Sequence, residues 1–123
     1  MSQGFPTPTR SWPQKFRDAF RGVWVAVSTQ TSFWVHSVFA ISVVAAGFWW
    51  RIETWQWSVL VLCMAGVLVA EMLNSALERM AKAVDAEYNP HVRDALDMGS
   101  AAVLLAAMAS VSLGLVMFLP YLL

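Results

Sequence analysis

The first part of the chain alternates apolar and charged residues at helical spacing. Between Trp12 and about Ser28, one face of the expected helix is apolar, and the charged residues fall largely off it. Pro13 suits a helix's first turn. The pattern predicts an amphipathic helix over 12–28, preceded by a flexible segment over 1–11. Such a helix lies on a membrane surface, although a simple basic anchor explains the same residues equally well. The residues of the apolar face are Phe16, Phe20, Val23 and Trp24.

Three longer segments are apolar over most of their length, and they predict helices over 30–51, 55–84 and 90–119. In the first, the apolar run from about Phe33 ends in the aromatic residues 48–50, a composition typical of a membrane interface. In the second, only Trp55–Leu73 is membrane-like, and the remainder should project into water. Asn89 and Pro90 suit the start of the third helix, and Pro120 should end it.

These elements assemble into one membrane domain over residues 1–123. The short turn at 51–54 makes the first two long helices antiparallel. The third helix carries a small residue at every fourth position, a spacing that lets helices approach closely in lipid. We therefore predict an all-α membrane protein with three transmembrane helices and an N-terminal amphipathic surface helix. The small residues are Ala102, Ala106, Ser110 and Gly114.

The composition supports a membrane protein. The chain is 59% hydrophobic and 13% charged, with a mean hydropathy of +0.57, whereas soluble domains are about 25% charged. A formal net charge of zero argues against a nucleic-acid partner. The single Cys63 cannot form an internal disulfide. The first thirty residues contain five charges and no compact apolar core, so we expect no cleavable signal peptide.

The basic residues predict the orientation. Of the eight Lys and Arg residues, four lie in the N-terminal segment, three lie between 79 and 93, and only Arg51 lies at the other end of the bundle. Cytoplasmic loops carry the excess of basic residues. The N-terminus and the polar 74–97 segment are therefore expected on the cytoplasmic side of the inner membrane, where ATP is present.

Candidate chemistry lies at the end of the second apolar run. Residues at offsets of three, four and seven share a helix face, so Glu71, Asn74, Ser75 and Glu78 form one polar stripe. Ionisable groups at this depth are costly and are usually functional. Carboxylates are also the ligands through which Mg²⁺ is held beside phosphates. Together with Asp97 on the next helix, Glu71, Asn74 and Glu78 are expected to form a site that can bind a metal–phosphate and deprotonate a hydroxyl.

Other polar residues extend this region. Asp97 and Ser100 are three residues apart on the third helix and should face the second helix. Polar groups near helix ends often only cap and solvate them, and we favour that role for Asp85, Arg93 and Asp94. We do not favour it for Glu71, which is the deepest acid and has no cation beside it in the sequence. Because Glu71 needs partners away from lipid, oligomerisation is expected.

Three sequence blocks carry a resemblance to a known family. With residues 16, 19, 22 and 33, these blocks resemble the small prokaryotic diacylglycerol kinase and undecaprenol kinase family over about residues 15–119. Several blocks in the family's order and spacing make the resemblance specific. The blocks are Glu71-Met72-Leu73-Asn74-Ser75-Ala76-Leu77-Glu78, Glu87-Tyr88-Asn89-Pro90 and Asp97-Met98-Gly99-Ser100-Ala101-Ala102-Val103.

The resemblance implies a fold and an activity. It implies three transmembrane helices with a surface helix, assembled as a homotrimer with active sites between protomers. The implied reaction is the phosphorylation of a membrane lipid hydroxyl, on diacylglycerol or an undecaprenol-like alcohol, by ATP with Mg²⁺. Glu71 matches the family's catalytic base, Glu78 matches a metal-binding carboxylate, and Ser100 matches a position near the lipid hydroxyl. The matched nucleotide-binding residues are Asn74, Glu78, Glu87, Tyr88 and Asp97.

The chain departs from the family pattern at four positions. The second metal ligand is usually a glutamate, and Gln30 stands there as a weaker ligand. Leu96 replaces a lysine before Asp97 and cannot contact a phosphate. Trp34 replaces an arginine, and Lys82 replaces an acid. A lipid kinase with an altered nucleotide site is the leading interpretation. The alternative is a weakened member that acts as a membrane binding or scaffold protein, or as a subunit of a larger complex.

The orientation can be tested by labelling. A reporter fused after Leu123 should be periplasmic, because the C-terminal end carries no basic residue. A cysteine placed at Asp85, with Cys63 replaced, should react with an impermeant reagent only from the cytoplasmic side. Labelling in the opposite pattern would show that the predicted orientation is inverted.

Overall fold

The structure is a computed structural model that describes residues 9–84 and 89–123. Within these residues it contains helices and no strand, which confirms the all-α prediction. Three of the helices are long and apolar enough to cross a membrane. The helices are α1 (Trp12–Thr29), α2 (Thr31–Trp50), α3 (Thr54–Lys82) and α4 (Pro90–Leu122).

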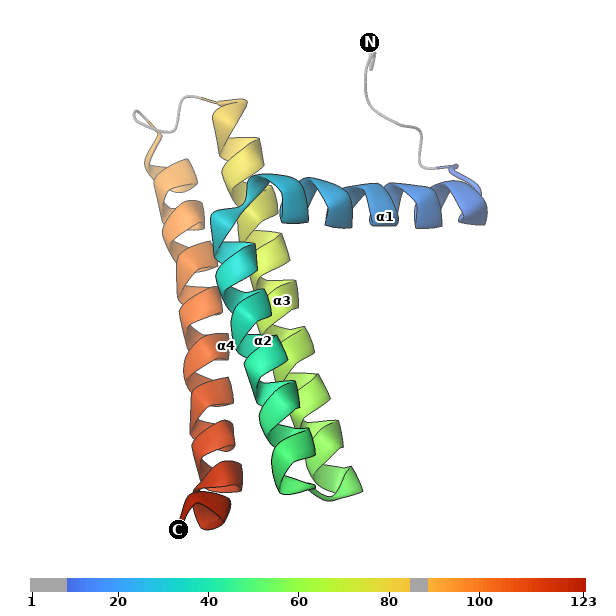
Figure 1. Ribbon diagram of the computed structural model, residues 1–123. Coiled ribbons are helices and arrows are strands. Elements are labelled where there is room, and N and C mark those ends of the chain that lie inside the picture. The colour runs from blue at the N-terminus through green and yellow to red at the C-terminus, as the bar shows by residue number, and fades with distance from the viewer. Residues whose placement is uncertain (1–8, 85–88) are drawn as a thin grey trace.

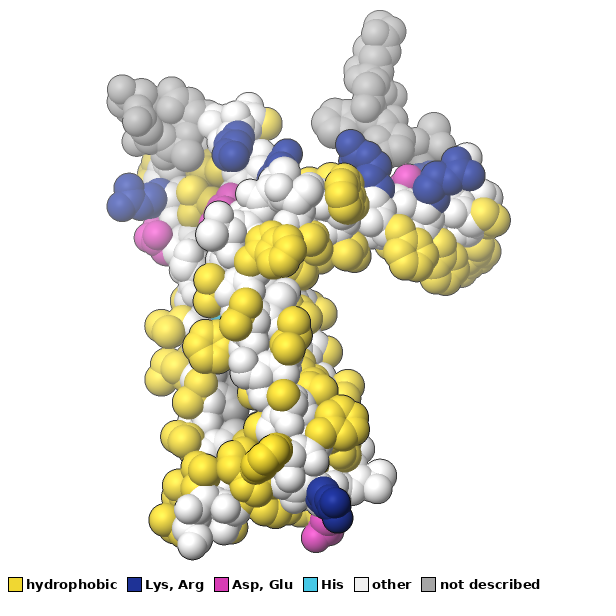
Figure 2. All heavy atoms as spheres, in the orientation of Figure 1, with side chains coloured by type: hydrophobic (Ala, Val, Ile, Leu, Met, Phe, Trp, Pro, Cys, Tyr) yellow, Lys and Arg dark blue, Asp and Glu magenta, His cyan; other side chains and the backbone are white. Residues whose placement is uncertain are grey.

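The three long helices lie side by side, and α1 projects sideways from one end of them (Figure 1). The largest contact joins α3 and α4, and a smaller one joins α2 and α3. Gln30 separates α1 from α2, because its backbone is extended and interrupts the helix. Figure 2 shows apolar side chains on the side of α1 toward the bundle and basic side chains on the other side. This arrangement is the one expected of a helix lying at a membrane surface.

Local sequence explains where the helices begin. Ser11 and Gln14 form a reciprocal capping box at the start of α1, and Glu53 and Gln56 form another at the start of α3. The side chain of Asn89 accepts hydrogen bonds from the backbone N–H groups of residues 91 and 92 at the start of α4. Arg51 ends α2 in the left-handed conformation, with φ of 51°. These local interactions explain where the helices begin and where α2 ends, without reference to tertiary packing.

Aromatic residues join the three long helices at the end of the bundle away from α1. The ring of Trp50 lies 5.8 Å from that of Phe118 and 6.5 Å from that of Tyr121. The Tyr121 hydroxyl donates to Oε1 of the buried Gln56 at 3.0 Å. The contacts fasten the end of α4 to the turn between α2 and α3.

The end of α4 differs from the sequence-based expectation. The helix continues through Pro120 to Leu122 rather than ending before the proline. Proline lacks a backbone N–H, but its place in the last turn limits the disruption to one missing hydrogen bond. The N–H of Leu123 still reaches the carbonyl of Leu119 at 3.1 Å. At the other helix ends, the observed bounds differ from the expected ones by at most two residues.

Large apolar side chains cover the outside of the bundle (Figure 2). Leu62, Leu105 and Val116 are 73%, 67% and 75% exposed. In water, each exposed Å² of apolar surface costs roughly 25 cal/mol. A lipid environment removes this cost, in agreement with three membrane-spanning helices.

Gly99 is a position where α4 packs closely on α3. A Cβ atom on Gly99 would lie 2.5 Å from Oδ1 of Asn74 and 3.0 Å from Cδ1 of Leu77. The small-residue ridge of α4 makes a looser contact. Ser110 donates its hydroxyl to the carbonyl of Cys63 at 3.4 Å, whereas a Cβ on Gly114 would meet nothing within 4 Å. The close packing therefore lies beside the polar stripe of α3.

Replacing Gly99 should destabilise the bundle. Alanine is intrinsically better than glycine in a helix by about 1 kcal/mol. Gly99→Ala, however, would displace the buried Asn74 side chain and press on Leu77, and this overpacking should cost about 1–3 kcal/mol. Gly66→Ala is the matched control, because its Cβ would meet nothing within 4 Å. Thermal unfolding in detergent should show a lower midpoint for Gly99→Ala only. Equal midpoints for the two variants would contradict the close contact.

Candidate functional site

A cluster of buried polar side chains lies on α3, in its half nearer α1. Glu71, Asn74 and Ser75 are 4%, 8% and 5% exposed, whereas Glu78 is exposed. They occupy one face of α3, as the helical spacing predicted. The buried part of this face is held against α2 and α4, and Glu78 continues it toward water. The stripe therefore runs from the apolar interior to an accessible end.

The Glu71 carboxylate is contacted on both oxygens by side chains of α2. The Ser32 hydroxyl donates to Oε1 in a short hydrogen bond. Nε2 of His36 lies 3.4 Å from Oε2. Ser32 and His36 are one helical turn apart, so the two groups approach from the same face of α2. The carboxylate is therefore held in one orientation by a neighbouring helix.

Sequence reasoning missed Ser32 and His36 as members of this site. A signal was present, because Ser32 and His36 are four positions apart and share one face of a mostly apolar span. Such a stripe indicates a face turned toward a polar partner rather than toward lipid. The sequence did not indicate which residue that partner is.

Asn74 connects the buried and exposed parts of the stripe. Its amide Nδ2 donates to Oε1 of Glu78 at 3.1 Å. Its Oδ1 faces Gly99. Among the described residues, neither this oxygen nor the buried Oγ of Ser75 has a hydrogen-bond partner. Unpaired buried polar atoms are uncommon and often mark a functional position or a bound water.

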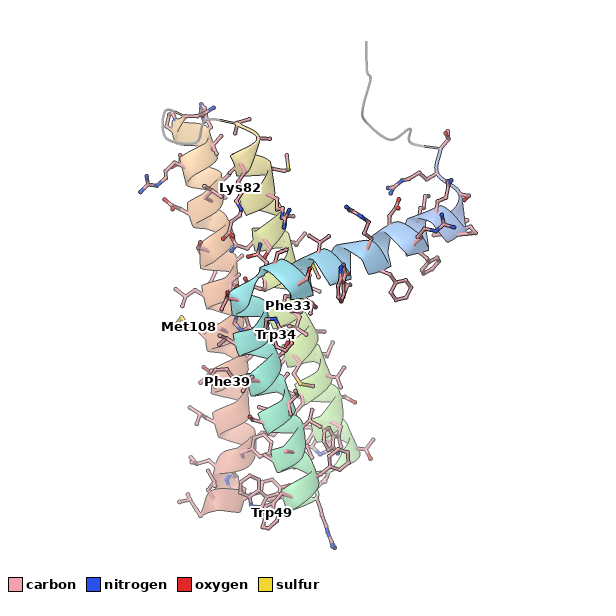
Figure 3. All side chains as sticks on the ribbon, turned by 45° about the horizontal axis from the view of Figure 1, so that its top comes forward. Phe33, Trp34, Phe39, Trp49, Lys82 and Met108 are labelled. Carbon is pink, nitrogen blue, oxygen red and sulfur yellow. The ribbon has the colours of Figure 1, made fainter. Side chains whose placement is uncertain are left out.

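The joint between α1 and α2 lies against the same region of α3. The guanidinium of Arg79 donates to the Thr29 hydroxyl at 3.1 Å. The Trp34 indole donates to the carbonyl of Val27 at 2.9 Å, which braces the joint around Gln30. Figure 3 shows Phe33 and Trp34 near this joint and Lys82 beyond it on α3. The hydrogen bond thus joins Thr29, which precedes Gln30, to Arg79, which follows Glu78.

The expectation that Asp97 and Ser100 face α3 is wrong within a single chain. Asp97 is exposed, and its carboxylate lies 3.9 Å from Nε of Arg93 on the same helix. Ser100 is exposed as well. Gly99 faces α3 instead, and residues two apart on a helix point roughly 200° apart. Asp97 therefore points away from the stripe.

Two predicted nucleotide-binding residues, Glu87 and Tyr88, lie outside the described residues, as does Asp85. Among the departures from the family pattern, Lys82 and Trp34 are exposed, whereas Gln30 and Leu96 are half-buried. The nucleotide-binding assignments of Glu87 and Tyr88 therefore stay predictions.

An apolar groove of about 530 Å³ runs between α2, α3 and α4. His36 lies at one end of it, beside the Glu71 carboxylate, and Phe118 lies at the other. The residues between are mostly apolar and include Phe39, Val43, Met64 and Val111. The groove offers space for a hydrocarbon chain whose polar end reaches the site.

The described residues contain no group of three or more acidic, histidine or cysteine side chains that would hold a metal by itself. Glu78 supplies one accessible carboxylate, and the half-buried Gln30 carries an amide oxygen. The Asn74 oxygen is buried against Gly99 and is not available beside Glu78. This set fits Mg²⁺ that arrives with a nucleotide, because Mg²⁺ is usually held by one or two carboxylates together with phosphates and water.

Comparison with known proteins gives a consistent result. Residues 17–118 match the family described as prokaryotic diacylglycerol kinase. The chain is 30% identical over 107 residues to undecaprenol kinase of Bacillus subtilis, with 87% of each chain covered. It is 37% identical over 109 residues to a diacylglycerol kinase of Synechocystis, covering 88% of this chain and 62% of that protein. It is 29% identical over 93 residues to diacylglycerol kinase of Escherichia coli, with 76% of each chain covered.

Proposed function

This chain belongs to the prokaryotic diacylglycerol kinase family and is a lipid kinase, and from that premise we propose that it transfers the γ-phosphate of ATP to the hydroxyl of a membrane lipid alcohol. The relatives are named for diacylglycerol and for undecaprenol, so the proposed substrate is a lipid alcohol of either kind. Its apolar chain would lie in the groove between α2, α3 and α4, which ends at the Glu71 cluster.

The observation that carries the proposal is the buried, oriented carboxylate of Glu71. A charged group at this depth is costly unless it is paired. The carboxylate is 4% exposed and is held by Ser32 and His36. A general base needs a fixed position within hydrogen-bond reach of the proton that it takes. Glu71 combines such a position with a location between an apolar groove and the accessible Glu78.

The proposed reaction is a direct transfer. The lipid hydroxyl oxygen forms a bond to the γ-phosphorus, while the bond from that phosphorus to the bridging oxygen of ADP breaks. The hydroxyl proton passes to the Glu71 carboxylate, and ADP leaves. Glu78 and Gln30 would hold Mg²⁺, which supplies charge neutralisation on the phosphates. Asn74 holds the Glu78 carboxylate in place through its amide.

The remaining assignments follow from the same premise. We propose a homotrimer, the assembly that the family resemblance implies. Asp97 and Ser100 are exposed in one chain, so a second copy would bring Glu71 to them. Asp97, Glu87 and Tyr88 would contact nucleotide, and Ser100 would lie near the lipid hydroxyl. The proposed location is the inner membrane, with the N-terminus in the cytoplasm. Seven of the eight Lys and Arg residues lie at the end of the bundle that carries α1, and basic residues gather on the cytoplasmic side.

Removing the base should remove most of the transfer. Glu71→Gln keeps the size and hydrogen-bonding capacity of the side chain but cannot take a proton, so kcat should fall by roughly a factor of 10² to 10⁴. ATP affinity should change little. Glu53→Gln is the control, since Glu53 is an exposed acid at the opposite end of the bundle. Transfer from labelled ATP to diacylglycerol, undecaprenol and other lipid alcohols measures the effect. Full activity of Glu71→Gln would show that the base is assigned wrongly.

Restoring the family pattern should strengthen the nucleotide site. Gln30→Glu adds a carboxylate and should lower the Mg²⁺ concentration needed for half-maximal rate. Leu96→Lys adds a cation and should lower the KM for ATP, whereas Leu96→Met should change neither. The assay compares Mg²⁺ with Mn²⁺ and Zn²⁺. If wild type and the doubly restored variant transfer no phosphate to any lipid alcohol, a scaffold or binding role replaces the proposed one.

A further inference from the structure

We propose that His36 is a positioning residue for phosphate transfer: with Ser32, it holds the Glu71 carboxylate in the orientation that accepts the substrate proton. The inference rests on the proposed function, because it assigns a role within the same reaction. It concerns a side chain that neither the sequence motifs nor the resemblance to the family identified.

The geometry gives each oxygen of Glu71 its own partner. His36 Nε2 lies 3.4 Å from Oε2, and the Ser32 hydroxyl donates to Oε1. The Glu71 side chain is 5% exposed and the His36 side chain is 20% exposed. Among the described residues, no Lys or Arg lies within 4.0 Å of this carboxylate. Both side chains in these contacts with the carboxylate therefore come from one face of α2.

The chemistry of the two groups defines the arrangement. An ionised carboxylate can only accept hydrogen bonds, so a neutral imidazole must carry its proton on Nε2 to pair with it. With a proton on Nε2, His36 can donate to Oε2 and so fix the orientation of the carboxylate. A carboxylate offers about four acceptor positions. One donor on each oxygen thus leaves room for the substrate hydroxyl.

The place of His36 in the fold suits this role. Its side chain also lines the apolar groove between α2, α3 and α4. It therefore stands where the apolar part of a lipid in the groove would end and its hydroxyl would begin. Ser32 lies one turn closer to the joint at Gln30, outside the groove lining. His36 consequently links the position of the base to the surface that would receive the substrate.

The two roles open to His36, positioning and mere packing, predict different kinetics. A misplaced catalytic group can cost about a hundredfold in rate. His36→Leu removes the donor and should lower kcat about tenfold to a hundredfold, with the KM values for ATP and lipid nearly unchanged. His36→Gln places an amide N–H near the position of Nε2 and should recover most of the rate. Ser37→Ala is the control, because the Ser37 hydroxyl bonds only to the Phe33 carbonyl of its own helix, at 2.8 Å.

A double-mutant cycle tests whether His36 acts through Glu71. In a Glu71→Gln background, His36→Leu should cause little further loss, since residues that act as one unit are not additive. The pairing itself can be read without activity. In a His91→Gln background, the remaining imidazole should show the Nε2-protonated tautomer by ¹⁵N NMR in detergent, and Glu71→Leu should shift its signals.

The outcomes separate this inference from the proposed function. An inactive wild type would overturn the proposed function, whatever the NMR shows of the pair. An active wild type with His36→Leu at full kcat would overturn the inference alone. Equal losses in His36→Leu and His36→Gln, or a full further loss in the Glu71→Gln background, would overturn it too. Recovery by His36→Gln together with a non-additive cycle supports it.

Discussion

The site depends on the requirement that a carboxylate inside a bundle of apolar helices must have partners. Glu71 is almost fully buried, and its own helix offers no side-chain donor to it among the described contacts. The partners come from α2, as a hydroxyl and an imidazole one turn apart. This requirement favours the rotation of α2 that turns Ser32 and His36 toward Glu71, because most of the other side chains of α2 are apolar and cannot pair with the carboxylate. The base is thus oriented by the same contact that orders the helices.

The rest of the packing supports this contact from the other side of α3. Gly99 brings the backbone of α4 against Asn74 and Leu77, so Asn74 lies buried with its amide directed at Glu78. The aromatic residues at the opposite end hold the three helices together there. The apolar groove between α2, α3 and α4 lies between the Gly99 contact and the aromatic contacts. The structure therefore combines a rigid polar cluster with an open apolar space beside it.

The departures from the family pattern lie around this cluster and not within it. Glu71, Asn74 and Glu78 retain their relation to one another on α3, whereas Gln30 and Leu96 change groups expected to contact metal and phosphate. Glu71, the group that would take the proton, is therefore distinct from the altered positions Gln30 and Leu96. A change in nucleotide binding can then leave the base and its partners intact. Asp97 and Ser100 point away from the base, which is consistent with a site completed by a second copy.

The sequence by itself determined the number and kind of helices, the turn at 51–54 and the polar face of α3. These features arise from local causes, namely apolar runs, capping residues and helical periodicity. Only the tertiary structure decided that Ser32 and His36 hold Glu71, that Gly99 rather than Asp97 meets α3, and that α4 continues through Pro120. Each of these depends on how a helix is rotated and placed against its neighbours. Helices that are apolar on nearly every side leave that rotation open, because lipid and protein interior accept the same residues.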